Sequence, residues 1–133
     1  MQEEQVRPFE KLTSLDVYLK SPTHMPVFQL LVNQCVNVEC LIFDQFYCDY
    51  EESLINRSLF EWSGLERLKE LSIGHGSQLS IVTVNVILAN CGQLRKLGRL
   101  DQWGKVSRHQ IESIRGEIQA RNFDLIIDAG DLI

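Results

Sequence analysis

The sequence predicts an α/β fold, in which about four or five strand–loop–helix units stack into a solenoid. The parallel sheet is expected on the concave face and the helices on the convex face. Short segments of one hydrophobic shape return at nearly constant spacing, and stretches of helical periodicity alternate with them. The length of 133 residues is enough for one domain with a substantial core.

The recurring segments fit the pattern L-x-x-L-x-L, where L is any large aliphatic or aromatic residue. They read LTSLDV from Leu12, VECLIF from Val38, LKELSI from Leu68 and LRKLGR from Leu94. Their starts lie 26, 30 and 26 residues apart. The fourth segment slips at its third position, where Arg99 stands, and a weaker fifth copy, NFDLII, starts 28 residues after the fourth. This spacing predicts one strand in each segment.

Helical periodicity fills the intervals between these segments. It predicts helices over residues 26–35, 53–62, 79–91 and 107–121. The third stretch is rich in Val and Thr, which lowers its helix propensity. The fourth is the clearest, because Ser107 and Gln110 have the spacing of a capping box and isoleucines follow at spacings of three and four.

Two of the four cysteines occupy one repeated position. Cys35 and Cys91 each stand three residues before a strand segment, within a shared apolar-x-x-apolar-x-x-x-Cys-x-x-L-x-x-L pattern. This pattern resembles the leucine-rich repeat, specifically the cysteine-containing type found in F-box proteins and their relatives. The resemblance covers residues 9–127 and implies the C-terminal part of a longer protein of that kind. The repeat that starts at Leu68 departs from it, with Leu65 at the cysteine position.

The expected organisation is one domain. Residues 1–8 form a lead-in or an expression remnant, and residues 9–133 form the repeat domain with a degenerate C-terminal repeat as its cap. The N-terminal edge of such a solenoid normally stacks on an earlier repeat. We therefore expect self-association through this edge, or a partner that covers it.

The cysteines and histidines do not form a chemical constellation. Cys35 and Cys91 are predicted to be buried for packing, because free cysteine is among the most buried residue types. Cys40 points to the opposite face of its strand, and Cys48 follows in the next loop. The chain has no C-x-x-C, and its three histidines are scattered and are expected to be solvated. We therefore predict no catalytic residue, no metal site and no cofactor, and hence not an enzyme.

The predicted binding surface is the concave face. Side chains alternate along a strand, so the residues between the L positions point away from the core. The predicted partner-binding residues are Asp16, Tyr18, Cys40, Ile42, Asp44, Glu70, Ser72 and Lys96. Tyr18 and Ile42 among acidic neighbours suit protein recognition. The alternative is that neighbouring parts of a longer protein, or long loops, cover them.

The leading hypothesis for function is a non-catalytic protein–protein interaction module. The F-box resemblance implies the partner-recognition part of a ubiquitin ligase, with the ligase adaptor bound through N-terminal parts not visible in this sequence. The alternative is a leucine-rich-repeat adaptor of an RNA-processing or RNA-export complex, because Arg and Lys concentrate in the last third. The net charge of −5 argues against a dedicated nucleic-acid module.

Three further features concern location. No apolar run approaches the roughly 18 residues of a membrane span. The polar, acidic N-terminus lacks signal-peptide chemistry. The cysteines are most simply reduced thiols, so a cytoplasmic or nuclear protein is expected.

Overall fold

The structure, a computed structural model, describes residues 11–21, 24–45 and 50–130. The strands of this part are β1 (Ser14–Tyr18), β2 (Cys40–Asp44), β3 (Glu70–Gly74), β4 (Lys96–Gly98) and β5 (Ile126–Ile127). The helices are α1 (Met25–Gln34), α2 (Glu52–Phe60), α3 (Ile81–Asn90) and α4 (Arg108–Ala120). Short 3-10 helices, η2 (Leu65–Arg67) and η3 (Leu100–Gln102), precede β3 and follow β4.

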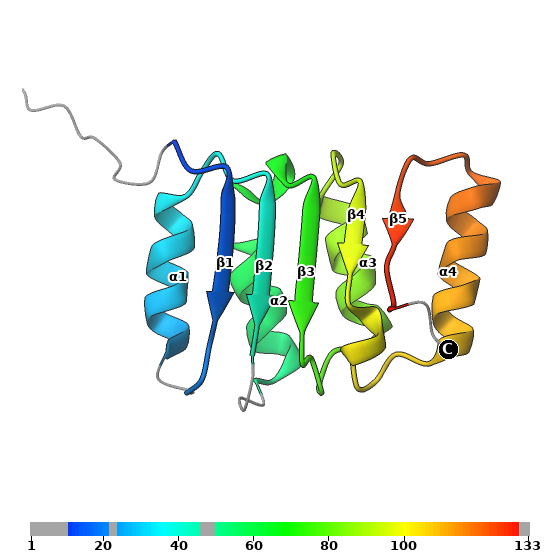
Figure 1. Cartoon of the computed structure of the whole chain (residues 1–133), viewed down its shortest axis with the longest axis horizontal. Coiled ribbons are helices and arrows are strands. Elements are labelled where there is room, and N and C mark those ends of the chain that lie inside the picture. Colours follow the sequence, from blue (N-terminus) through cyan, green and yellow to red (C-terminus); the bar gives the residue numbers. More distant parts are fainter. Residues whose placement is uncertain (1–10, 22–23, 46–49, 131–133) are drawn as a thin grey trace, which may run out of the picture.

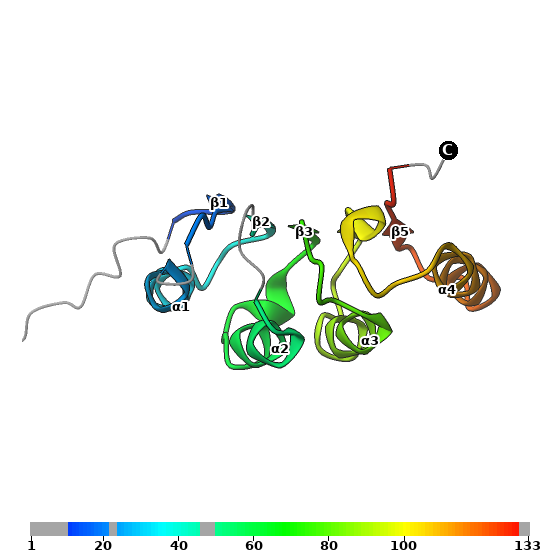
Figure 2. The same cartoon turned by 90° about the horizontal axis from the view of Figure 1, so that it is seen from below.

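The strands form one sheet in the order β1-β2-β3-β4-β5, and every neighbouring pair is parallel (Figure 1). The helices of the described residues lie on one side of this sheet (Figure 2). We call the other side the open face. The predicted α/β class, with a parallel sheet and helices along one side, is confirmed to this extent.

The register aligns the residues assigned to the inward positions. One row across the sheet consists of Leu15, Leu41, Leu71, Leu97 and Ile127. Its interior members are fully buried, whereas Leu15 on the edge strand is only half-buried. The core therefore lies between the sheet and the helices, and the inward side chains of this row are least buried at β1.

The predicted helices are observed with small shifts at their ends. The capping box of α4 is present: Ser107 Oγ accepts from the Gln110 backbone N–H, and Gln110 Oε1 accepts from the Ser107 N–H. α3 forms despite its β-branched residues, because Ser80 caps it by accepting from the Val82 N–H. α3 also buries Thr83 and other residues against the core. Capping and burial therefore offset its weak propensity.

The repeated cysteines close their helices in the same way. Cys35 is the C-cap of α1 with φ −107° and ψ 70°, and Cys91 is the C-cap of α3 with φ −115° and ψ 74°. Both side chains are buried, as predicted.

The slip in the fourth segment has a local cause. Arg99 adopts a left-handed conformation with φ 65°, which ends β4 and turns the chain into η3. Leu100, one residue later, is the apolar residue that enters the core instead of Arg99, and it is fully inaccessible to solvent. Trp103 follows, also buried, and its Nε1–H donates to the Ile73 carbonyl at 2.8 Å.

Candidate functional site

The open face carries the predicted partner-binding residues in three adjacent rows. The rows are Ser14–Cys40–Glu70–Lys96–Ile126, Asp16–Ile42–Ser72–Gly98 and Tyr18–Asp44–Gly74. Because the strands are parallel and in register, residues up to 112 positions apart in the sequence, from Ser14 to Ile126, share one row. The register thus brings together all eight predicted residues.

The β1–β2 side of this face presents an aromatic and an aliphatic side chain beside a carboxylate. Tyr18 is 54% exposed, which is high for an aromatic residue. Ile42 is half-buried and lies beside Asp16 in the register. Asp16 is exposed and forms no ion pair with any residue of the described part. These three residues, the Tyr18 patch, can therefore offer both apolar contact and negative charge.

The surroundings of Cys40 disfavour its reactive thiolate form. Burial raises the pKa of the Cys40 thiol, and the hydrogen bond from its Sγ to Glu70 Oε2 at 3.5 Å raises that pKa further. A reactive cysteine needs the opposite environment, one that stabilises the thiolate. Cys40 is therefore a surface thiol that donates a hydrogen bond.

The other cysteines give no reactive group within the described residues. Burial raises the pKa of the Cys35 thiol, and it raises the pKa of the Cys91 thiol to about 12. Cys48 lies outside the described residues. No group of three or more His, Cys, Asp or Glu side chains in the described ranges could hold a metal ion.

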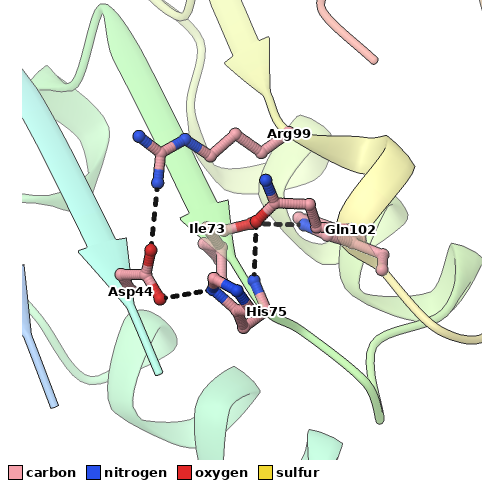
Figure 3. Close-up of polar contacts among 6 residues, drawn as sticks. Asp44, Ile73, His75, Arg99 and Gln102 are labelled. Atoms are coloured by element: carbon pink, nitrogen blue, oxygen red, sulfur yellow. Dashed lines mark hydrogen bonds and ion pairs between the residues drawn. The ribbon is translucent and has the colours of Figure 1, made fainter. Parts of the chain in front are cut away.

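A polar cluster lies where β2, β3 and β4 end (Figure 3). Asp44 Oδ1 is 2.7 Å from His75 Nδ1, and Asp44 Oδ2 accepts from an Arg99 guanidinium nitrogen at 3.2 Å. Gln102 Oε1 accepts from the backbone N–H of His75 at 2.9 Å. We call these four residues the Asp44 cluster. Its carboxylate is almost inaccessible, with the Asp44 side chain 6% exposed.

Gly74 makes the Asp44 cluster possible. A Cβ on Gly74 would lie 2.8 Å from Asp44 Oδ2 and 2.9 Å from the bonded Arg99 nitrogen. His75 and Arg99 also have positive φ values, 52° and 65°, which L-residues rarely adopt. The cluster therefore depends on a missing side chain and on two turns, and it ties three strand ends together.

One expectation differs from the structure here. Asp44 lies on the expected face, but its carboxylate is buried beneath partners rather than presented to solvent. His75 is exposed to solvent, as expected, and its imidazole also contacts Asp44. The sequence contained one signal for this: polar residues stand at or just after the ends of consecutive segments, and parallel strand ends meet at one edge of a sheet.

Several basic residues of the last third have partners within the chain. These are Arg99 with Asp44, Arg108 with Glu112, Lys96 with Asp128 at 4.0 Å, and Arg115 with the Ile127 carbonyl. The three carboxylate partners offset part of the local positive charge.

A groove of about 780 Å³ opens on the helix side, between α3 and α4. Leu88, Leu94 and Ile118 are among its apolar lining residues, and Arg95 and Arg121 contribute charged ones. The groove lies away from the open face, so the molecule offers two separate surfaces.

No helix within the described residues has the length and apolar character needed to cross a membrane. In comparisons with known proteins, no family model, no curated protein and no solved structure matches this chain.

Proposed function

We propose that this chain is a non-catalytic protein-interaction module of the leucine-rich-repeat kind, and that it binds its partner with the open face. The observation that carries the proposal is the Tyr18 patch. Exposed aromatic and aliphatic side chains within a polar surround are typical of residues that dominate binding energy. The patch stands on a five-stranded sheet, so the strands fix its geometry before any partner arrives.

Two features support the leucine-rich-repeat assignment. The inward residues of the L-x-x-L-x-L segments fall into one row of a parallel sheet, as the repeat requires. Cys35 and Cys91, at equivalent places in the pattern, adopt nearly the same backbone conformation at the ends of α1 and α3. In this reading the open face is the concave face of the solenoid.

The finer proposal is recognition of a protein that a ubiquitin ligase then modifies. It rests on the resemblance of the cysteine-type repeats to those of F-box proteins. The contact with a ligase adaptor would belong to parts outside this chain, and the present residues would choose the partner.

Site-specific photocrosslinking tests the binding surface. A photoreactive amino acid at Tyr18 is expected to capture a protein in cells of the source organism, whereas the same group at the exposed Ser113 on α4 is not. Binding of the captured protein, purified and added back, is expected to fall at least ~10-fold with Tyr18→Ala, a typical loss for an aromatic anchor. Ser113→Ala is the matched control. Equal binding by both variants would place the interface elsewhere.

The ligase role has its own readout. More ubiquitin should be attached to the captured protein when the longer protein proposed to contain this chain is present. Tyr18→Ala should abolish this increase. Binding of the captured protein without any change in its ubiquitin content would leave an interaction module and remove the ligase role. Binding of labelled RNA that weakens steeply with salt would favour the RNA-adaptor alternative instead.

A further inference from the structure

Two basic side chains of the open face already have carboxylate partners. Lys96 Nζ lies 4.0 Å from Asp128 Oδ2. Arg99, just after β4, donates from its guanidinium to Asp44 Oδ2 at 3.2 Å (Figure 3). The Asp44 side chain is only 6% exposed, so this second pair is largely withdrawn from solvent. Each of these cations is therefore at least partly neutralised within the chain.

Two carboxylates of the same face have no such partner. Asp16 on β1 and Glu70 on β3 are both exposed, and neither forms an ion pair with any described residue. Glu70 accepts a weak hydrogen bond from Cys40 Sγ at 3.5 Å, which leaves its charge in place. Lys96, the neighbour of Glu70 in the register, lies beside Asp128 instead. The unmatched charge is therefore negative, and a cation complements it.

Tyr18 stands where a cation bound to Asp16 meets an aromatic ring. The two residues are two positions apart on β1, so their side chains point to the same face and their Cα atoms are about 7 Å apart. The Tyr18 side chain is 54% exposed. A positive group within about 6 Å of the centre of such a ring is attracted to it. A cation between Asp16 and Tyr18 therefore gains from both.

The third residue of the Tyr18 patch favours arginine as that cation. Ile42 is the register partner of Asp16, on a strand about 4.8 Å away, and it is half-buried. The methylene groups of an arginine can cover Ile42 while its planar guanidinium stacks on Tyr18 and donates to Asp16. The ammonium group of lysine can pair with Asp16, but it has no plane to stack. One arginine side chain thus contacts the whole patch.

We propose that the open face binds a protein segment that presents an arginine, and that the arginine side chain occupies the Tyr18 patch. The inference rests on the function proposed above and adds the chemistry of the partner. Glu70 gives the segment a second place for a basic side chain, two strands away from Asp16. A nucleic acid is repelled by the same carboxylates, because its phosphates are negative.

Selection from a displayed library of random peptides tests the partner chemistry. The unchanged chain should enrich peptides that contain arginine, and Asp16→Asn should lose this enrichment. Asp124→Asn is the matched control, because it removes the same charge from an exposed residue beside the α3–α4 groove. Enrichment of peptides without arginine, or the same enrichment by Asp16→Asn, would overturn the inference.

Citrulline locates the arginine on the chain, because it has nearly the shape of arginine and no charge. A selected peptide is synthesised with each arginine in turn replaced by citrulline, and binding is measured by fluorescence anisotropy. One replacement should weaken binding to the unchanged chain and to Asp124→Asn by ~3-fold or more, the size of an exposed ion pair. With Asp16→Asn the loss should shrink, because the two changes remove one interaction. An equal loss in all three chains would place the arginine elsewhere and overturn the inference.

Lys20 provides a change of the opposite sign. It is exposed, two residues after Tyr18, and its charge opposes that of an incoming arginine. Lys20→Gln should therefore leave the binding of the arginine peptide unchanged or strengthen it by up to ~3-fold, whereas Asp16→Asn weakens it. Weaker binding with Lys20→Gln would contradict the charge argument.

The outcomes separate this inference from the proposed function. Peptides that lose binding with Tyr18→Ala but tolerate citrulline would keep an open-face interaction module and remove the arginine. Peptides that tolerate both Tyr18→Ala and Asp16→Asn would contradict both proposals. A selection that enriches no peptide would count against the arginine site, and crosslinking at Tyr18 would still decide whether the open face binds a protein.

Discussion

The two spaces on either side of α3 are closed to different degrees. Towards α2, the Glu52 carboxylate receives hydrogen bonds of 2.6 to 2.9 Å from Ser80 and Thr83, and Thr83 is fully buried. Towards α4, a groove of about 780 Å³ separates the helices. One helix therefore has a sealed flank and an open flank.

The difference follows from how the neighbouring helix is attached. α4 is joined to the end of the sheet: Arg115 donates twice to the Ile127 carbonyl of β5, at 3.1 and 2.7 Å. The chain reaches α4 through η3 and the buried Trp103. α4 is thus positioned by the strand side of the molecule, and α3 need not touch it closely. Matched hydrogen-bonding groups close the first space, and the path of the chain leaves the second open.

The largest effect is expected at Trp103, the residue on which the α4 attachment depends. Trp103→Ala removes a side chain that is 2% exposed and the hydrogen bond from Nε1 to the Ile73 carbonyl. A loss of ~3–5 kcal/mol in the free energy of unfolding is expected, as for other buried aromatic residues. Urea denaturation measures it. Phe60→Ala on α2, where the ring is 65% exposed, is the control and should change it by no more than ~0.5 kcal/mol.

Glu52 should come next, because it seals the α2–α3 space. Glu52→Ala leaves Ser80 and Thr83 donors without their acceptor in a partly buried place, so a loss of ~1–3 kcal/mol is expected. Glu51→Ala, one residue earlier and exposed, is the matched control. If both variants lost the same amount, the hydrogen bonds across this space would not be what closes it.

The same carboxylate predicts a pH dependence. Burial alone would raise the pKa of Glu52, but hydrogen bonds from Thr83 and Ser80 outweigh it and lower that pKa below its usual value. A lowered carboxyl pKa stabilises the folded state above the unfolded value of ~4.3, and this contribution is lost as the pH falls through the folded pKa. Between pH 7 and pH 3, the melting temperature of Glu52→Gln should therefore fall less steeply than that of the unchanged chain.

Much of the fold was predictable because hydrophobic segments of one shape recur in the sequence. The spacing of the L-x-x-L-x-L segments predicted the strands, and periodicity with caps such as Ser107 predicted the helices to within a few residues. These signals are local: alternation, helical period and capping each depend on neighbouring residues.

The Asp44 cluster and the groove could not be predicted in this way. The first depends on Gly74 having no side chain and on the left-handed turns at His75 and Arg99. The second depends on the route of the chain around Trp103, which sets the distance between α3 and α4. Both arise from contacts between segments that are distant in sequence.

The equivalent cysteines, both buried, offer a finer comparison of a position away from the groove with one that lines it. Cys35 is fully buried, whereas Cys91 is 4% exposed and lines the groove. A serine hydroxyl at residue 35 would be buried without water, so Cys35→Ser should cost ~1–2 kcal/mol. Cys91→Ser should cost less, because a hydroxyl there can reach water in the groove. Urea denaturation of both variants tests the order, and a larger loss for Cys91→Ser would contradict an open groove.

The smallest effect is expected on the open flank of α3 itself, at Ala89, which is exposed and lines the groove. Ala89→Leu adds apolar volume to a space that can accept it, so the free energy of unfolding should change by no more than ~0.5 kcal/mol. The matched change on the sealed flank is Thr83→Leu, which overpacks a filled site and removes the hydrogen bond to Glu52, at a cost of ~1–3 kcal/mol. Helix propensity favours Thr83→Leu over Ala89→Leu, because Leu is a better helix former than Thr and a slightly poorer one than Ala, so propensity cannot produce the expected order. Similar losses for the two, measured by urea denaturation, would mean that the groove closes in solution and that the flanks of α3 are equivalent.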